Sequence, residues 1–377
     1  MQNWIVPYVL ETRRRRKPTF DHPMHLLLCV ADHFEPHYGR PGVERSRQRV
    51  EEWVEKYPRL FGEFRDNDGR RPRHTFFYPM EQYDTCHLDS LAPLCADGWG
   101  EVELQLHHDN DTSENLRRSL LEFKRRLSED YGFLGRRRDS NEVAYAFVHG
   151  NWCLDNSAPD GRWCGVNDEL TVLRETGCYA DFTFPSAPSL TQTRQINSIY
   201  YACDDPRKPK SHDRGVRVGS APQPRDSLML IQGPLMLDWA GKKWGFLPIL
   251  ENSCIQLTQP PSPRRLDLWL KARIQVPSRP DWLFLKLYTH GAHEEAQAVL
   301  LGDATVNLHR TLAERRERNA NFCFHYVTAR EMYNLVRAAE SGWKGSVADA
   351  RDFEILPPPA KVIPALNAGR VAIGSQR

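Results

Sequence analysis

Short apolar segments alternate with amphipathic ones along most of the chain. The apolar segments are rich in β-branched and aromatic residues and have the lengths of strands buried on both faces. The predicted strands cover residues 25–31, 73–78, 101–107, 143–149, 179–184, 228–232, 282–289 and 321–327. Between them, apolar residues recur three and four positions apart, which is the spacing of one face of a helix. The predicted helices cover residues 45–57, 114–131, 168–176, 264–274, 293–301, 308–319 and 329–341, and Thr112 or Ser113 can cap the second of these.

Strand and helix alternate, which predicts an α/β fold with parallel strands, and about eight strands predict a barrel or partial barrel. The region from 186 to about 263 interrupts this alternation because it is rich in Pro, Gly, Ser and Asn. It is too long for a plain connection, so we expect a β-rich insertion there. The expected division is a basic N-terminal arm (1–22), the α/β domain (23–345) and an extended C-terminal tail (346–377), in which three consecutive prolines follow Leu356.

Composition narrows the function classes. The 377 residues include 51 Lys+Arg and 49 Asp+Glu, a net charge of +2, which argues against a general nucleic-acid binder. No segment has the roughly 20 apolar residues of a membrane helix. At the N-terminus a short apolar segment precedes the basic residues 13–17, the reverse of a secretory signal, so we expect a cytoplasmic protein. We interpret the basic residues as a solvated arm; docking on nucleic acid or an anionic membrane is a weaker alternative.

The nine cysteines lack CxxC spacing and indicate buried reduced thiols.

Polar residues gather where the predicted strands end. Asp32 and His33 directly follow the first predicted strand, and His290 directly follows the 282–289 strand. His107 ends the 101–107 segment and is followed by His108 and Asp109. His149 ends the 143–149 segment and is followed by Asn151 and Trp152, and Asp181 lies in the 179–184 segment. In a parallel α/β barrel, all strand C-termini open onto one face, where active sites are built. The sequence therefore predicts a metal or acid/base site at this face.

The residue types narrow the chemistry of this site. Imidazole and carboxylate without thiolate suit Zn²⁺, Fe²⁺, Co²⁺ or Ni²⁺ in an open site. Such a metal polarises a carbonyl and lowers the pKa of bound water to about 7. A separate carboxylate and a separate His would then act as base and acid, and Asp32 and His290 can face a substrate from different strands. Trp152 either stacks on a sugar face or packs on a loop.

These residues, in this order, resemble the polysaccharide deacetylases, or NodB-type carbohydrate esterases. The resemblance covers about 25–340 and leaves 186–263 as an unmatched insertion. It implies a distorted (β/α) barrel of about seven to eight strands. It also implies a metal-dependent hydrolase, with Zn²⁺ foremost, that removes N- or O-acetyl groups from a glycan or other glycoconjugate.

Carried over residue by residue, the resemblance makes Asp32 the catalytic base, supported by Asp181, and His290 the general acid. His33 stands where the family has a metal-binding aspartate. The family's two metal-binding histidines, four residues apart, match Gln105 and Asp109, or Gln105 and His107 in a variant pattern. The implied ligands are therefore His33, His107 and either His108 or Asp109, with Asp32 as base or ligand. The segment from His149 through Asn151 to Trp152 resembles the substrate loop but lacks its usual Arg.

Two functions thus remain open at this stage. The first is a metal-dependent deacetylase acting on an acylated amino sugar or polysaccharide. The alternative is a catalytically silent glycan-binding protein that keeps the barrel and an aromatic rim, for which Trp152, Trp163, Trp239 and Trp244 are candidates.

Overall fold

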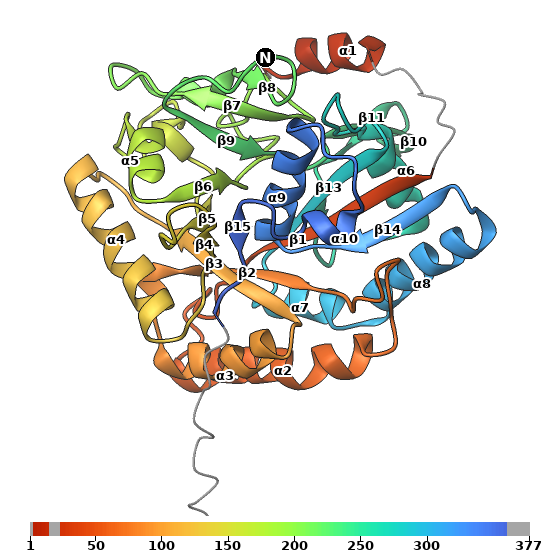
Figure 1. Ribbon diagram of the computed structural model, residues 1–377, viewed down its shortest axis with the longest axis horizontal. Coiled ribbons are helices and arrows are strands. Elements are labelled where there is room, and N and C mark those ends of the chain that lie inside the picture. The colour runs from red at the N-terminus through yellow and green to blue at the C-terminus, as the bar shows by residue number, and fades with distance from the viewer. Residues whose placement is uncertain (1–2, 15–22, 360–377) are drawn as a thin grey trace, which may run out of the picture.

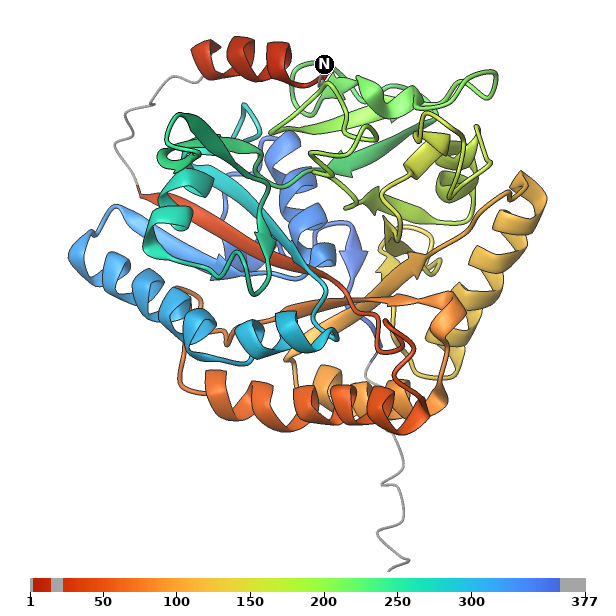
Figure 2. The same cartoon turned by 180° about the vertical axis from the view of Figure 1, so that it is seen from behind.

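A large, mostly parallel sheet with helices on both faces forms the centre of the computed structural model, which describes residues 3–14 and 23–359 (Figures 1 and 2). Each predicted strand is present. They are β1 (Met24–His33), β2 (His74–Pro79), β3 (Gly100–Leu106), β5 (Tyr145–His149), β6 (Cys178–Asp181), β9 (Ser227–Ile231), β13 (Trp282–Thr289) and β14 (Phe322–Tyr326). The strand order is β12-β13-β1-β2-β3-β5-β6-β9-β7-β8, with β14 also pairing with β1.

The sheet is open. Its end strands are β12 (Cys254–Ile255) and β8 (Val216–Arg217), and within the described residues no pairing joins them. Pairing is parallel from β12 to β9 and antiparallel at the far edge, where β7 (Ile199–Cys203) pairs with β9 and β8. A mixed α/β fold with parallel strands is therefore confirmed, and a closed barrel is not.

The predicted helices are also present, as α2 (Val43–Phe61), α4 (Ser113–Glu129), α5 (Glu169–Glu175), α6 (Pro263–Ala272), α7 (Glu294–Leu300), α8 (Asp303–Arg318) and α9 (Ala329–Glu340). Thr112 caps α4 by accepting a hydrogen bond from the backbone N–H of Asn115 at 3.3 Å, as predicted. The prediction missed α3 (Thr85–Ala96), which contains Pro93 and lacks a regular charged face; Asp84 caps it.

The region 186–263 is β-rich, as predicted, but most of its strands extend the central sheet. Strands β7, β8, β9 and β12 all join that sheet. Only β10 (Met236–Lys243) and β11 (Leu247–Glu251) form a separate antiparallel hairpin. Low periodicity in this region concealed short strands that gain their stability from neighbours in the sheet.

The two ends of the chain correct the predicted division. Residues Ile5–Arg14 form helix α1; Tyr8 within it and Trp4 just before it are buried, so this part of the arm is not simply solvated. Residues 15–17 of the basic segment lie outside the described residues. The expected tail is wrong for its first part: α10 (Val347–Ala350) and β15 (Ile355–Leu356) are folded, with β15 pairing with β4 (Arg136–Arg137). The tail beyond 359 lies outside the described residues.

The two faces of the sheet contact different cores. Leu26 and Leu28 on β1, and Phe34 directly after it, belong to the core that contains the peripheral helices α2, α3, α4, α7 and α8; we call this side the outer face. Leu27, Cys29 and Ala31 belong to the core around α9, which lies across the middle of the sheet in Figure 1; we call this side the inner face. Because successive residues of a strand point to opposite faces, a shift of one position moves a side chain from one core to the other.

None of the described helices is both long and apolar enough to cross a bilayer.

Candidate active site

Strand β1 sends its terminal polar residues to opposite faces of the sheet. Asp32 follows the register of Leu28 and Phe34 on the outer face, whereas His33 and Glu35 follow Ala31 on the inner face. On β3, Val102, Leu104 and Leu106 point outward, so Gln105 and His107 point inward. On β13, His290 continues the inward series of Trp282 and Phe284. The inner face therefore brings together His33, Glu35, Gln105, His107 and His290.

Glu35 is the centre of this group. Its Oε1 accepts hydrogen bonds from Gln105 Nε2 at 2.5 Å and lies 3.3 Å from His107 Nε2. Its Oε2 lies 3.0 Å from Nε2 of His293, which immediately precedes α7. Burial by itself would raise the pKa of Glu35, but the hydrogen bonds from His107 and His293 outweigh it and hold that pKa well below its usual range. Glu35 is therefore a buried carboxylate, only 4% exposed, that carries its charge at neutral pH.

His33 and His290 complete a set of potential metal ligands with Glu35. One ligand atom from each of the three residues lies within 4.8 Å of the others, and the two imidazole rings are 5.0 Å apart. His33 Nδ1 is buried and has no hydrogen-bond partner among the described residues. Burial, helped by the neighbouring His290, holds the pKa of His33 well below its usual range. His33 is therefore neutral, which is the form that binds a metal.

His107 is held between two carboxylates. Its Nδ1 pairs with Glu81 Oε1, and its Nε2 faces Glu35. Burial would lower the pKa of His107, but the hydrogen bonds with Glu35 and Glu81 raise it to about 10. His107 is therefore a protonated, partly exposed imidazolium at neutral pH, and it can donate a proton to a group bound beside it.

A cavity of about 820 Å³ opens over this group. Glu35, His107, His290 and His293 line it, together with Trp152 and Tyr38. The Trp152 ring lies 5.6 Å from His290 and 5.8 Å from His33, and the exposed Tyr38 ring stacks on His293 at 3.6 Å. The cavity thus places flat aromatic surfaces beside charged and imidazole groups.

Asp32 and Asp181 do not line this cavity. Asp32 is completely buried: its Oδ2 lies 2.8 Å from His74 Nε2, and its Oδ1 accepts a hydrogen bond from the N–H of Gly291 at 2.5 Å. It therefore anchors the backbone directly after His290. Asp181 accepts hydrogen bonds from the N–H and hydroxyl of Thr183, and burial raises the pKa of Asp181 to about 7.

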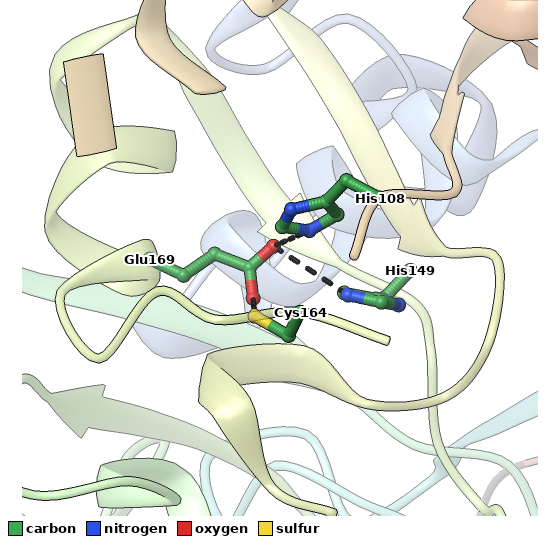
Figure 3. Close-up of side chains that lie close together, drawn as sticks. All are labelled: His108, His149, Cys164 and Glu169. Carbon is green, nitrogen blue, oxygen red and sulfur yellow. Dashed lines mark hydrogen bonds and ion pairs between the residues drawn. The ribbon is translucent and has the colours of Figure 1, made fainter. Parts of the chain in front are cut away.

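His108 and His149 lie apart from the cavity. On β5, Tyr145 and Phe147 point outward, and His149 continues that series. His108 joins it there, beside Cys164 and Glu169 (Figure 3). Asp109 is exposed and accepts a hydrogen bond from the N–H of Trp163 at 2.6 Å, while Asn151 and Trp152 do line the cavity. The predicted strand-end residues therefore form two separate clusters.

The sequence prediction missed Glu35, Glu81 and His293. Glu35 carried a usable signal, because it lies two positions after His33 and so shares its side of an extended chain. His293 lies three residues after His290 at the turn into α7. Glu81 lies in a 3-10 turn after β2 and reaches His107 only through the parallel pairing of β2 with β3, which no local pattern reveals.

A comparison with protein-family models and with curated proteins finds no match for this chain.

Gly150 offers a test of the His107 position. A Cβ atom there would overlap the imidazole ring of His107. We expect Gly150→Ala to displace this partly exposed ring and weaken its contact with Glu35, with little loss of stability, because the ring can move toward the cavity. Histidine NMR of the variant should show a lower His107 pKa, since the contact with Glu35, one of the two carboxylates that raise it, is weakened. An unchanged titration would show that the ring is not held in this way.

Proposed function

We propose that the protein is a metal-dependent hydrolase that removes an N- or O-linked acyl group from an amino sugar or glycan. The observation that carries the proposal is the unpartnered Nδ1 of His33, a residue buried beside Glu35 and His290, both of which line a large cavity. A buried imidazole nitrogen without a partner costs free energy, of the order of 1–3 kcal/mol. A metal ion held with Glu35 and His290 would offset that cost.

The side chains fit a divalent metal. Two imidazoles and one carboxylate are the donor types of open sites for Zn²⁺, and also for Co²⁺, Ni²⁺ or Fe²⁺. When bound, such a metal polarises the acyl carbonyl and makes water a nucleophile near neutral pH. Gln105 and His293 orient the Glu35 carboxylate through their hydrogen bonds, which keeps its position fixed.

His107 and Glu81 are proposed to move the proton. His107 is protonated and reaches the cavity, so its Nε2 can donate to the departing amine or alcohol while Glu81 stabilises the Nδ1 proton. The proton that the attacking water loses balances this donation and restores the His107 imidazolium. In this proposal Glu35 is the essential carboxylate of the site. Asp32 instead positions Gly291 and, through it, His290.

As part of the same proposal, the substrate is a sugar, and the protein is related to the polysaccharide deacetylases, whose fold is a distorted barrel. The residues at or just after the ends of β1, β3 and β13 that carry the resemblance include His107 and His290, which line the cavity, and His33, whose ring lies 5.0 Å from that of His290. Trp152 and Tyr38 offer the flat surfaces on which sugar rings stack.

Metal content and acetate release test the proposal together. Zinc-loaded protein should release acetate from one member of a panel of N-acetylated oligosaccharides and O-acetylated glycans. His33→Ala should lose one equivalent of zinc and the activity, whereas His309→Gln, a change at a buried His outside the cavity, should keep both. Suppose instead that the metal-loaded protein releases no acetate and that the His33→Ala variant binds glycans as tightly as the unmodified protein. The protein would then be a catalytically silent glycan-binding protein.

A further inference from the structure

A second group of potential metal ligands lies on the outer face, away from the cavity. It consists of His108, His149, Cys164 and Glu169 (Figure 3). One donor atom from each lies within 4.8 Å of every other. The four residues come from four segments: the end of β3, the end of β5, the loop before α5 and the first residue of α5. Cys164 was predicted only as a buried thiol, and Glu169 was not singled out.

The spacing of the donor atoms approaches that of a tetrahedral zinc site. Bonds of about 2.0–2.3 Å in a tetrahedron place the donor atoms about 3.3–3.7 Å from one another. The carboxylate of Glu169 lies 3.2 Å from His108 Nε2, 3.4 Å from Cys164 Sγ and 4.0 Å from His149 Nε2. Figure 3 shows all three side chains directed at this carboxylate.

His149 supplies an independent observation that points to a ligand at this cluster. Its side chain is fully buried, and its Nε2 has no hydrogen-bond partner within the part of the chain that the structure describes. The 4.0 Å gap to Glu169 is too wide for a hydrogen bond. The other ring nitrogen, Nδ1, accepts a hydrogen bond from the N–H of Asn151 at 3.3 Å, so a metal bound at Nε2 would move the ring proton to Nδ1 at the expense of this long hydrogen bond.

The surroundings also match those of metal ligands. Asp111 Oδ2 lies 3.1 Å from Nδ1 of His108, the carboxylate–histidine arrangement that orients a metal-binding imidazole. The sulfur of Cys164 accepts the N–H groups of Asn156 at 3.3 Å and Val166 at 3.5 Å, which stabilise negative charge on it. Burial, with Glu169 next to it, raises the pKa of the Cys164 thiol to about 11, so a bound metal would release its proton to solvent.

We propose that His108, His149, Cys164 and Glu169 form a structural zinc site, separate from the candidate active site. Its four ligands leave no open position for substrate, which distinguishes a structural from a catalytic site. The site fastens the loop from 150 to 168 to β3, β5 and α5. Because Asn151 and Trp152 belong to this loop and line the cavity, the zinc would fix one wall of the candidate active site.

Cobalt substitution tests this site specifically, because its ligand set includes a thiolate and the set of His33, Glu35 and His290 does not. Full-length protein stripped of metal and loaded with Co²⁺ should show a thiolate-to-cobalt absorption band in the near ultraviolet. Cys164→Ser should abolish the band and lower zinc content by one equivalent. Cys153→Ser, a change at a buried thiol of the same loop that is outside the cluster, should keep both.

The outcome is independent of the proposed hydrolase. His33→Ala should keep the cobalt band even where it abolishes acetate release. X-ray absorption at the zinc edge of the unmodified protein needs no variant, and should show one sulfur at about 2.3 Å together with nitrogen and oxygen ligands. A folded, zinc- or cobalt-treated protein without a sulfur ligand, or a band that survives Cys164→Ser, would overturn the proposal.

Discussion

Replacing Glu35 with Gln is expected to lower kcat/KM for acetate release by about 10³-fold, within the range that positioned acid–base and charged groups contribute to catalysis. Within residues 3–14 and 23–359, the carboxylate of Glu35 is the one negative charge that both His107 and His293 contact, and it lies with His33 and His290 in the ligand set. Gln keeps the size of the side chain but removes its charge. The variant should also bind Zn²⁺ more weakly, which competition with a chromophoric chelator measures.

The control for this change is Glu295→Gln. Glu295 also lines the cavity, but it is exposed and belongs to the rim at α7, so its substitution should change kcat/KM only slightly. Asp32→Asn separates the two possible carboxylates. If Glu35→Gln keeps full activity while Asp32→Asn loses it with the fold intact, Asp32 is the essential carboxylate, as the family resemblance implies, and our assignment of Glu35 is wrong.

Replacing Arg330 with Met is expected to lower the free energy of unfolding by about 3–5 kcal/mol, the usual cost of removing one partner from a buried ion pair. Arg330 on α9 is 2% exposed. Its Nη2 lies 2.9 Å from Glu101 on β3, and its Nη1 donates to Asp352 at 2.7 Å and to the carbonyl of Ile355 at 2.8 Å. Met fills a similar volume but leaves Glu101 with a buried charge and, among the residues that the structure describes, only Arg73, at 3.4 Å, as an ionic partner.

Chemical denaturation measures this loss, and Arg318→Ala is the control. Arg318 on α8 pairs with Glu314 at 3.1 Å, but both side chains are largely exposed, so the change should cost at most about 1 kcal/mol. An equal, small effect of the two substitutions would show that Arg330 does not fasten α9 and the segment after α10 to the sheet.

Most regular elements were predictable from the sequence because their signals are local. The apolar runs of β1, β3 and β13 and the helical stripe of α4 depend on residues a few positions apart. The short strands β7, β8 and β12 carry no such signal, since partners elsewhere in the sheet stabilise them. Helix α10 and strand β15 were mistaken for a tail for the same reason: contacts with α9 and β4 hold them.

The sequence by itself determined that His, Asp and Trp residues gather at the ends of parallel strands. Only the tertiary structure decided which of them meet. His107 and His108 are neighbours in sequence, yet they serve different clusters, because adjacent residues of an extended chain point to opposite faces. Closure of the sheet was likewise undetermined, since it depends on whether β8 and β12 meet, which is a matter of long-range pairing and twist rather than of any local pattern.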